Sequence, residues 1–216
     1  MKRTICLMTA IILLISFMNP CNQQTVQAGE EQSTRLLINS AKYALGLFLL
    51  AKLGETLTRQ RTNHTIEIKD QDIDPEAQNF LSDTVIVIDP GHGGYDPGAT
   101  GPSGLLEKDI NLEVALKLYN LLKTNTEATV YLTRSSDIYI SLSERTTYAR
   151  EKNADIFISI HHNGEKSGRQ RGLETYAHYN SSRQSWALAW DIHDCLSKQL
   201  GLPDKGLMAA NFQVLR

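Results

Sequence analysis

Cysteine is scarce in this chain of 216 residues, which contains three, at positions 6, 21 and 195. The first two lie in a segment that we predict below to be a removable leader. After its removal only Cys195 would remain, which excludes a disulfide within one molecule. The half-apolar, helix-like sequence around Cys195 favours a small core side chain over a reactive thiol.

An excess of charge of either sign is also missing. Lys and Arg number 22 against 24 Asp and Glu, for a formal net charge of -2. This balance argues against a nucleic-acid partner, because proteins that bind nucleic acids usually carry a strong positive excess. Hydrophobic residues make up 41% of the chain, which is enough for a packed core and excludes wholesale disorder.

The apolar run at the N-terminus, residues 5–17, is shorter than the roughly 20 residues that a transmembrane helix needs. Lys2 and Arg3 precede it, and the small-residue sequence Val26-Gln27-Ala28 follows it. This layout is typical of a secretory signal peptide cleaved after Ala28. We therefore predict that residues 1–28 are a signal peptide and that the protein is exported, to the periplasm or the outside of the cell.

Cys21 leaves a second form of processing open, in which it becomes the lipidated N-terminus of a bacterial lipoprotein and the protein is membrane-associated. The preceding sequence Met18-Asn19-Pro20 lacks the small residue that such processing normally uses.

Two segments are expected between the leader and the main domain. Residues 29–57 form an amphipathic helical segment, because apolar residues recur within 36–57 at a spacing close to the helical period. Such a helix packs on its own domain or on a partner such as an activator protein, or it lies on a membrane surface. Residues 58–83 are polar and irregular, which predicts a linker.

An alternating pattern of strands and helices begins at residue 84. Continuous β-branched runs are typical of strands buried on both faces, and apolar residues at helical spacing separate them. The strands are expected at 85–88, 129–132, 156–160 and 173–176, and the helices from Asp109, over 142–152 and around 186–200. The order predicts an α/β domain over residues 84–216, with a mostly parallel twisted sheet flanked by helices.

Both buried strands run into histidine. His92 follows the first strand in the loop Gly91-His92-Gly93-Gly94, and His161 and His162 end the second. The carboxyl ends of parallel strands meet at one edge of a sheet, where ligands collect, and Glu107 opens the helix between these strands. His92, Glu107 and His161 therefore form a candidate zinc-ligand set with an open fourth position for water.

Each of these residues also has a plainer explanation. His92 alone is a histidine in a glycine-rich loop, Glu107 complements a helix N-terminus, and His162 is a hydrogen-bonded neighbour that orients His161. The loop lacks the spacing of a dinucleotide-binding or phosphate-binding motif, which excludes those sites. Only the joint placement of the three residues indicates a metal.

Several stretches share their order and spacing with a known family. They are Val87–Gly94, Asp96–Ala99, Gly104–Leu112, Leu132–Arg134, Leu142–Arg145, Ala154–His161 and Gly172–Tyr176. On these stretches the sequence from residue 84 to the last residue resembles the zinc-dependent N-acetylmuramoyl-L-alanine amidases, the group-3 cell-wall amidases. The first 83 residues resemble no family that we can name.

The resemblance implies that His92, Glu107 and His161 bind a zinc ion and that His162 does not. It also implies an activity on peptidoglycan, hydrolysis of the amide between the lactyl group of N-acetylmuramic acid and L-alanine, in cell-wall turnover or daughter-cell separation. Zinc suits this reaction, because it lowers the pKa of a bound water to ~7 and polarises the scissile carbonyl.

The resemblance also predicts a general base that this sequence does not contain. In the family the general base is a glutamate on a late strand. It follows shortly after a segment like Asn211–Arg216, and this chain ends with that segment. We therefore expect a fragment that lacks the last strand of the family fold, with Phe212 and Val214 in a strand-like alternation. The alternatives are that the chain is a natural truncation that binds without cleaving, or that another acid in the chain takes the place of the missing base. Glu174 is the in-chain candidate, although a cross-strand or surface partner is favoured for it.

Arg134 and Arg145 have two interpretations: they could hold substrate carboxylates, or they could form internal ion pairs with Asp137 or Glu144. We leave both outside the predicted site.

Two other functions stay open at this point. The chain could be a catalytically inactive, zinc-retaining module that binds peptidoglycan, or a zinc peptidase that cuts between amino acids, because metal-activated water serves both hydrolases.

Overall fold

The computed structural model describes residues 10–17, 81–101, 103–163, 172–200 and 202–216. The predicted helical segment at 29–57 and nearly all of the predicted linker at 58–83 lie outside these residues. Among the described helices, none has the length and apolarity needed to cross a membrane.

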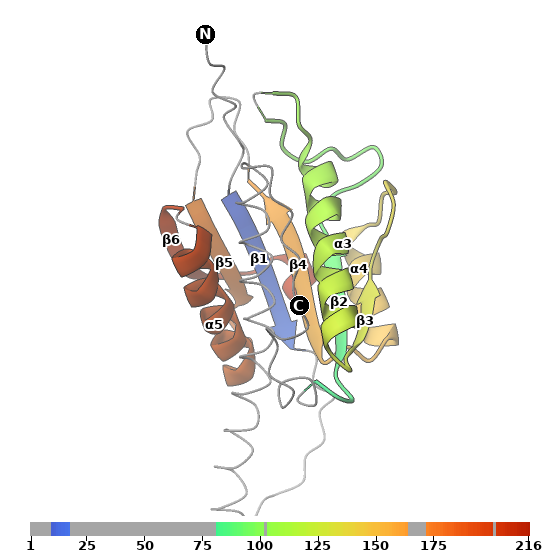
Figure 1. Cartoon of the computed structure of the whole chain (residues 1–216), viewed down its shortest axis with the longest axis vertical. Helices are drawn as coiled ribbons and strands as arrows, with labels where there is room; N and C mark the ends of the chain where they lie inside the picture. The colour runs from blue at the N-terminus through green and yellow to red at the C-terminus, as the bar shows by residue number, and fades with distance from the viewer. Residues whose placement is uncertain (1–9, 18–80, 102, 164–171, 201) are drawn as a thin grey trace, which may run out of the picture.

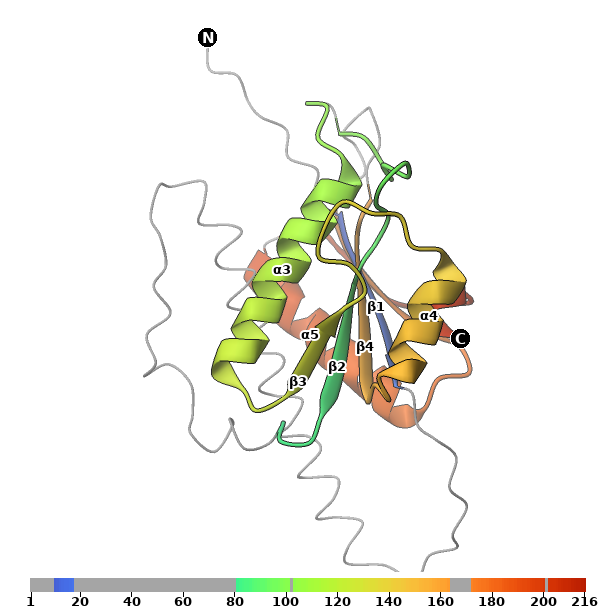
Figure 2. The same ribbon diagram turned by 90° about the vertical axis from the view of Figure 1, so that its right-hand side faces the viewer.

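The described residues form one six-stranded sheet covered by helices on both faces (Figures 1 and 2). The sheet has the strand order β3-β2-β4-β1-β5-β6. Its strands are β1 (Ala10–Phe17), β2 (Val85–Pro90), β3 (Thr129–Leu132), β4 (Ile156–His162), β5 (Gly172–His178) and β6 (Asp204–Ala210). The helices are α3 (Glu107–Asn125), α4 (Leu142–Glu151) and α5 (Arg183–Leu200), followed by the 3₁₀ turn η3 (Gln213–Leu215).

Two apolar cores lie on the two faces of this sheet. The larger core lies between the sheet and helices α3 and α5, and includes Ile158, Leu118 and Ile192. The smaller core includes Val87 and Phe157, with Ala149 of α4 and Val214 and Leu215 of η3. Helix α4 begins at a capping box, in which the Ser141 hydroxyl and the Glu144 carboxylate each accept from the other residue's backbone N–H.

The predicted α/β class is confirmed, and four of the five strand pairings are parallel. The remaining pairing, between β1 and β4, is antiparallel, so β1, β5 and β6 run opposite to β2, β3 and β4. The pattern did not predict this reversal. The connection from β4 to β5 is shorter than the dozen or more residues that a parallel crossover needs, and this length is compatible with reversed strands.

Strand β1 occupies a place where we predicted no strand. Ala10–Phe17 lies inside the predicted signal peptide, yet it pairs with β4 on one side and with β5 on the other (Figure 1). An apolar segment with several isoleucines has the composition of an interior strand as well as that of a leader, so sequence pattern alone does not separate the two.

The C-terminal region also differs from expectation. β6 was not predicted, because it is an edge strand with mostly half-exposed residues and a glycine at position 206, which weakens its pattern. The strand-like alternation predicted for Phe212 and Val214 is wrong. These residues lead into and form the 3₁₀ turn η3, where consecutive Val214 and Leu215 are both buried, as a helical turn allows and a strand on one sheet face does not.

Candidate metal centre

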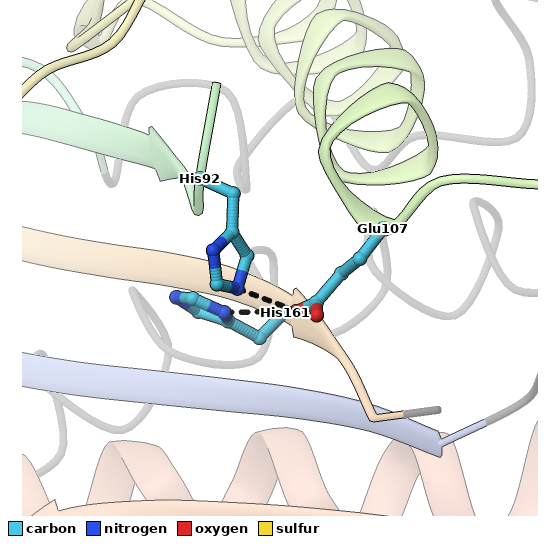
Figure 3. Close-up of side chains that lie close together, drawn as sticks. All are labelled: His92, Glu107 and His161. Atoms are coloured by element: carbon cyan, nitrogen blue, oxygen red, sulfur yellow. Dashed lines mark hydrogen bonds and ion pairs between the residues drawn. The ribbon is translucent and has the colours of Figure 1, made fainter. Parts of the chain in front are cut away.

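Two imidazoles and one carboxylate converge at the carboxyl ends of β2 and β4 (Figure 3). His92 lies in the loop after β2, Glu107 is the first residue of α3, and His161 lies near the end of β4. Glu107 Oε1 is 3.0 Å from His161 Nδ1 and 3.2 Å from His92 Nε2. The structure therefore brings together the three residues that the sequence singled out.

This arrangement has the dimensions of a metal site. One ligand atom from each residue lies within 4.8 Å of the other two. A tetrahedral zinc ion with bonds of ~2.0–2.1 Å separates its ligand atoms by about 3.3 Å, close to the two nitrogen–oxygen distances above. Two nitrogens and one carboxylate oxygen are also a donor set that zinc accepts at catalytic sites. The residues fit a zinc ion.

A second layer of hydrogen bonds orients these side chains. His92 Nδ1 lies 2.8 Å from Asp96 Oδ2, which leaves Nε2 directed at Glu107. Ala99 donates its backbone N–H to Glu107 Oε2 at 2.8 Å, and the backbone N–H of His162 donates to Oε1 at 3.1 Å. Carboxylates behind ligand imidazoles and donors behind ligand carboxylates are typical of metal sites, because they fix the orientation of the ligands.

Charge at the cluster is set by the carboxylates. Burial alone would raise the pKa of Glu107, but hydrogen bonds with His161 and His92 outweigh it and hold the pKa far below its usual range. Burial alone would lower the pKa of His92, and Glu107 and Asp96 together raise it above its ordinary value. Glu107 is thus ionised at neutral pH and stabilises a positive charge beside it.

His162 lies outside the cluster of three potential ligands. Its side chain is buried on the opposite face of β4, where Nδ1 lies 2.7 Å from Asn111 Oδ1. Burial lowers the pKa of His162 to about 4, so its imidazole is neutral at neutral pH. His162 contributes to the site through its backbone N–H, which donates a hydrogen bond to Glu107 Oε1.

Glu174 lies on the same sheet face as His161, with one strand between them. His161 and Glu174 both pair with Ile12 of β1, from opposite sides. The Glu174 oxygens accept from Lys205 Nζ at 2.7 Å, from the Tyr176 hydroxyl at 2.9 Å and from the Asn163 amide at 3.1 Å.

These contacts favour the cross-strand role of Glu174. Burial raises the pKa of Glu174, but its hydrogen bonds with Lys205 and Tyr176 prevail and lower it. A carboxylate stabilised in this way is a weaker proton acceptor than a free one.

Arg134 and Arg145 are buried and donate hydrogen bonds to the backbone of the His92 loop. Arg134 donates to the carbonyl oxygens of Pro90 and Gly91 at 2.9 and 2.8 Å. Arg145 donates to those of Pro90 and His92 at 2.8 and 2.9 Å. Three backbone carbonyl groups thus receive four hydrogen bonds from charged donors, which fixes the loop that carries His92.

The partners that we considered for these arginines are wrong. Asp137 accepts from Lys108 and the Gly94 N–H, and Glu144 caps α4. The carboxylate that pairs with Arg145 is Asp89, at 2.7 Å and fully buried. Sequence reasoning missed Asp89, although a signal was present: an acid that ends a buried apolar strand requires a buried partner.

Gly91 is the point at which the His92 loop touches His161. A methyl group added at Gly91 would lie 2.2 Å from the His161 ring, so Gly91→Ala must displace that imidazole. We expect the substitution to weaken zinc binding by roughly 10- to 100-fold, the effect of disturbing the surroundings of a metal ligand. Competition with a chromophoric chelator measures the affinity.

Gly104→Ala is the matched control. An added methyl group there meets no atom of the described residues within 4 Å, although the positive φ of 82° costs backbone strain. It should leave the zinc affinity within about twofold. Equal zinc affinities for the two variants would contradict the crowding argument.

Comparison with known families decides what the domain is. The family of N-acetylmuramoyl-L-alanine amidases (Amidase_3) matches residues 86–216, which include all three residues of the cluster. The chain belongs to this family. The first 85 residues lie outside the matched amidase region.

Individual amidases are similar over the same region. The sporulation-specific N-acetylmuramoyl-L-alanine amidase of Bacillus subtilis (strain 168) is 42% identical over 132 residues, covering 61% of this chain and 50% of that protein. The amidase LytC of the same organism is 40% identical over 144 residues, covering 65% of this chain and 28% of that protein. The chain thus spans half the length of the first relative and less of the second.

Solved structures of amidases share the fold. The catalytic domain of CwlV, an amidase from Bacillus (Paenibacillus) polymyxa var. colistinus, is 40% identical with a TM-score of 0.57, covering 62% of this chain and 73% of that one. An amidase from Clostridium difficile 630 is 36% identical with a TM-score of 0.59 at the same coverage. The α/β arrangement is therefore that of amidase catalytic domains.

Proposed function

We propose that this protein is a zinc-dependent hydrolase that cleaves the amide between the lactyl group of N-acetylmuramic acid and L-alanine in peptidoglycan. The observation that carries the proposal is the convergence of His92, Glu107 and His161 at the sheet edge of a domain that belongs to the amidase family.

In this proposal each residue of the cluster has a defined task. His92, His161 and Glu107 would hold the metal, and Asp96, 2.8 Å from His92 Nδ1, would keep the His92 proton on that nitrogen so that Nε2 stays free. Bound zinc supplies a water of pKa ~7 and polarises the scissile carbonyl. Glu107 remains anionic throughout the working range of pH, because its pKa lies far below it.

We do not assign proton transfer to Glu174. Its oxygens are engaged by three donors, so accepting a proton would cost part of the stabilisation by Lys205, Tyr176 and Asn163. We propose instead that Glu174 joins β4, β5 and β6 beside the metal cluster.

The test is hydrolysis of purified peptidoglycan by the full chain before and after metal removal. We expect release of stem peptides that begin with L-alanine, loss of this release when a chelator removes zinc, and its return on addition of one equivalent of zinc per chain. Mass spectrometry of the products identifies the bond, and elemental analysis counts the metal.

The other outcomes separate the remaining functions. Products cut between amino acids would indicate a zinc peptidase. Zinc-dependent sedimentation with cell walls and no release would indicate a binding module. Full activity in a chain containing less than about a tenth of an equivalent of metal would contradict the proposal.

We also propose that the protein is exported through the predicted signal peptide, because its proposed substrate is the cell wall. A molecule whose signal peptide has been cleaved cannot contain strand β1, because cleavage after Ala28 removes Ala10–Phe17. A processed chain would expose the facing edges of β4 and β5, and unpaired edges in the middle of a sheet recruit another strand.

A further inference from the structure

Two tyrosines beside the metal cluster form an exposed stack. The rings of Tyr95 and Tyr139 lie 4.2 Å apart between centroids and 27° from parallel. Tyr95 is 78% exposed and Tyr139 is 42% exposed, and the neighbouring residue Ile138 is also exposed. We call Tyr95 and Tyr139 the tyrosine platform. Exposed aromatic surface grouped in this way is typical of a binding site.

The platform is tied to the metal cluster through a tight turn. Gly93 and Asp96 exchange backbone hydrogen bonds of 3.0 and 3.1 Å, which places Tyr95 in the turn between them. The base of this turn carries His92 on one side and, on the other, Asp96, the carboxylate that holds its imidazole. Tyr95 and the proposed metal ligand His92 therefore lie on the same short loop.

Hydrogen bonds hold together the two loops that carry the platform. The Gly94 N–H donates to Asp137 Oδ1 at 2.7 Å, and Lys108 Nζ bridges Asp137 Oδ2 and the Gly94 carbonyl at 2.6 and 2.9 Å. A side chain at Gly94 would lie 2.7 Å from the Tyr139 nitrogen, so the two loops are in direct contact. Loops that are fixed before binding lose little backbone entropy when a ligand arrives.

The charges around the platform favour the glycan part of the proposed substrate over the peptide part. Lys108 and Asp137 pair with each other, and the buried Arg134 and Arg145 are directed at backbone carbonyl groups of the His92 loop. The charged groups that act on Tyr95 are the carboxylates of Asp96 and Glu144. A peptide with free carboxylates gains no ionic partner there. A sugar ring has an apolar face of C–H groups that packs on an aromatic ring, and hydroxyls at its edge that bond to tyrosine hydroxyls.

We propose that Tyr95 and Tyr139 form a glycan subsite that stacks a sugar ring of the strand whose N-acetylmuramic acid lies at the metal. The inference rests on the proposed function and adds to it the part of the substrate that is recognised. An amidase that uses this subsite binds long glycan strands more tightly than single sugars carrying the same peptide.

The test compares the Tyr95→Ala/Tyr139→Ala double variant with wild type and with Tyr179→Ala, all as zinc-loaded full chains. Tyr179 is a matched control, because it is 54% exposed and stacked on His178, yet it follows the end of β5 that lies away from the metal. Thermal unfolding checks that all three chains are folded.

The first measurement is binding of peptide-free glycan strands of alternating N-acetylglucosamine and N-acetylmuramic acid. We expect the double variant to bind about tenfold more weakly than wild type and Tyr179→Ala to match wild type, since one aromatic contact changes affinity by up to about tenfold. This measurement needs no hydrolysis, so it tests the inference even in a chain that does not cleave.

The second measurement is the ratio of KM for a monosaccharide-peptide to KM for a tetrasaccharide-peptide. We expect a ratio of about ten for wild type and for Tyr179→Ala, and a ratio near one for the double variant.

Equal glycan affinity in all three chains would overturn the inference. The inference would also be overturned if the double variant bound the free stem peptide more weakly than wild type and bound the glycan equally well, because the platform would then be a peptide subsite.

Discussion

His161→Ala is expected to abolish peptidoglycan hydrolysis, with kcat/KM reduced by about 10³-fold or more. The imidazole supplies one of three proposed ligands, and it lies 3.0 Å from Glu107 Oε1, so its removal opens the cluster. A metal that activates water contributes several kcal/mol to the reaction, which corresponds to this loss of rate. Release of stem peptides and the zinc content of the purified chain are the two measurements.

His178→Ala is the control for losing a histidine. His178 ends β5 and contacts Asn211 and Tyr179, away from the cluster. It should retain zinc and activity within about twofold. Stoichiometric zinc and full activity in a chain with both His92→Ala and His161→Ala would contradict the metal centre.

Asp89→Ala is expected to lower the free energy of unfolding by about 3–5 kcal/mol, the usual cost of removing one partner of a buried ion pair. Asp89 is fully buried and accepts from Arg145 Nη1 at 2.7 Å, from the Thr133 hydroxyl at 2.6 Å and from the Ser159 hydroxyl at 2.7 Å. The change leaves the Arg145 charge buried without its carboxylate, next to the buried Arg134. Urea unfolding at pH 7 measures the loss.

Two further variants make this prediction falsifiable. Asp89→Asn keeps the shape of the side chain and removes the charge, so it should lie between wild type and Asp89→Ala, and it serves if the alanine variant does not fold. Asp194→Ala removes a partly exposed carboxylate paired with Lys198 and should cost less than about 1 kcal/mol. Similar losses for Asp89→Ala and Asp194→Ala would contradict a buried structural pair.

The consequence of losing Asp89 should reach the metal cluster. Arg145 and Arg134 hold the carbonyl groups of Pro90, Gly91 and His92, and Asp89 fixes Arg145 in this position. The stability of the fold and the geometry of the His92 loop therefore depend on the same buried charges.

Elements with a strong, uniform burial pattern were predictable. β2 and β4 are apolar runs buried on both faces, and α5 repeats its buried Leu188, Ile192 and Leu196 every four residues. The structure contains all three, with ends shifted by a few residues from the predicted bounds. Such patterns follow from local periodicity and need no knowledge of distant segments.

Elements whose burial is partial or depends on distant partners were not predictable. β6 is a half-exposed edge strand, η3 is defined by two buried residues in succession, and β1 has a composition shared by leaders and strands. For β6 and η3 the local pattern fits more than one structure, and the contacts made in the folded chain select one of them. For β1 the strand and the proposed cleaved leader remain two alternatives.

The sequence by itself determined the α/β class, the placement of His92, Glu107 and His161 at one edge of the sheet, and the family resemblance. These follow from strand ends and spacing, because parallel neighbouring strands carry their last residues to a common edge. Only the tertiary structure decided the reversal of β1, β5 and β6, the pairing of Asp89 with Arg145, and the stacking of Tyr95 on Tyr139. The reason is physical: local sequence reports period and burial, whereas the identity of a long-range partner is fixed only when packing brings distant segments together.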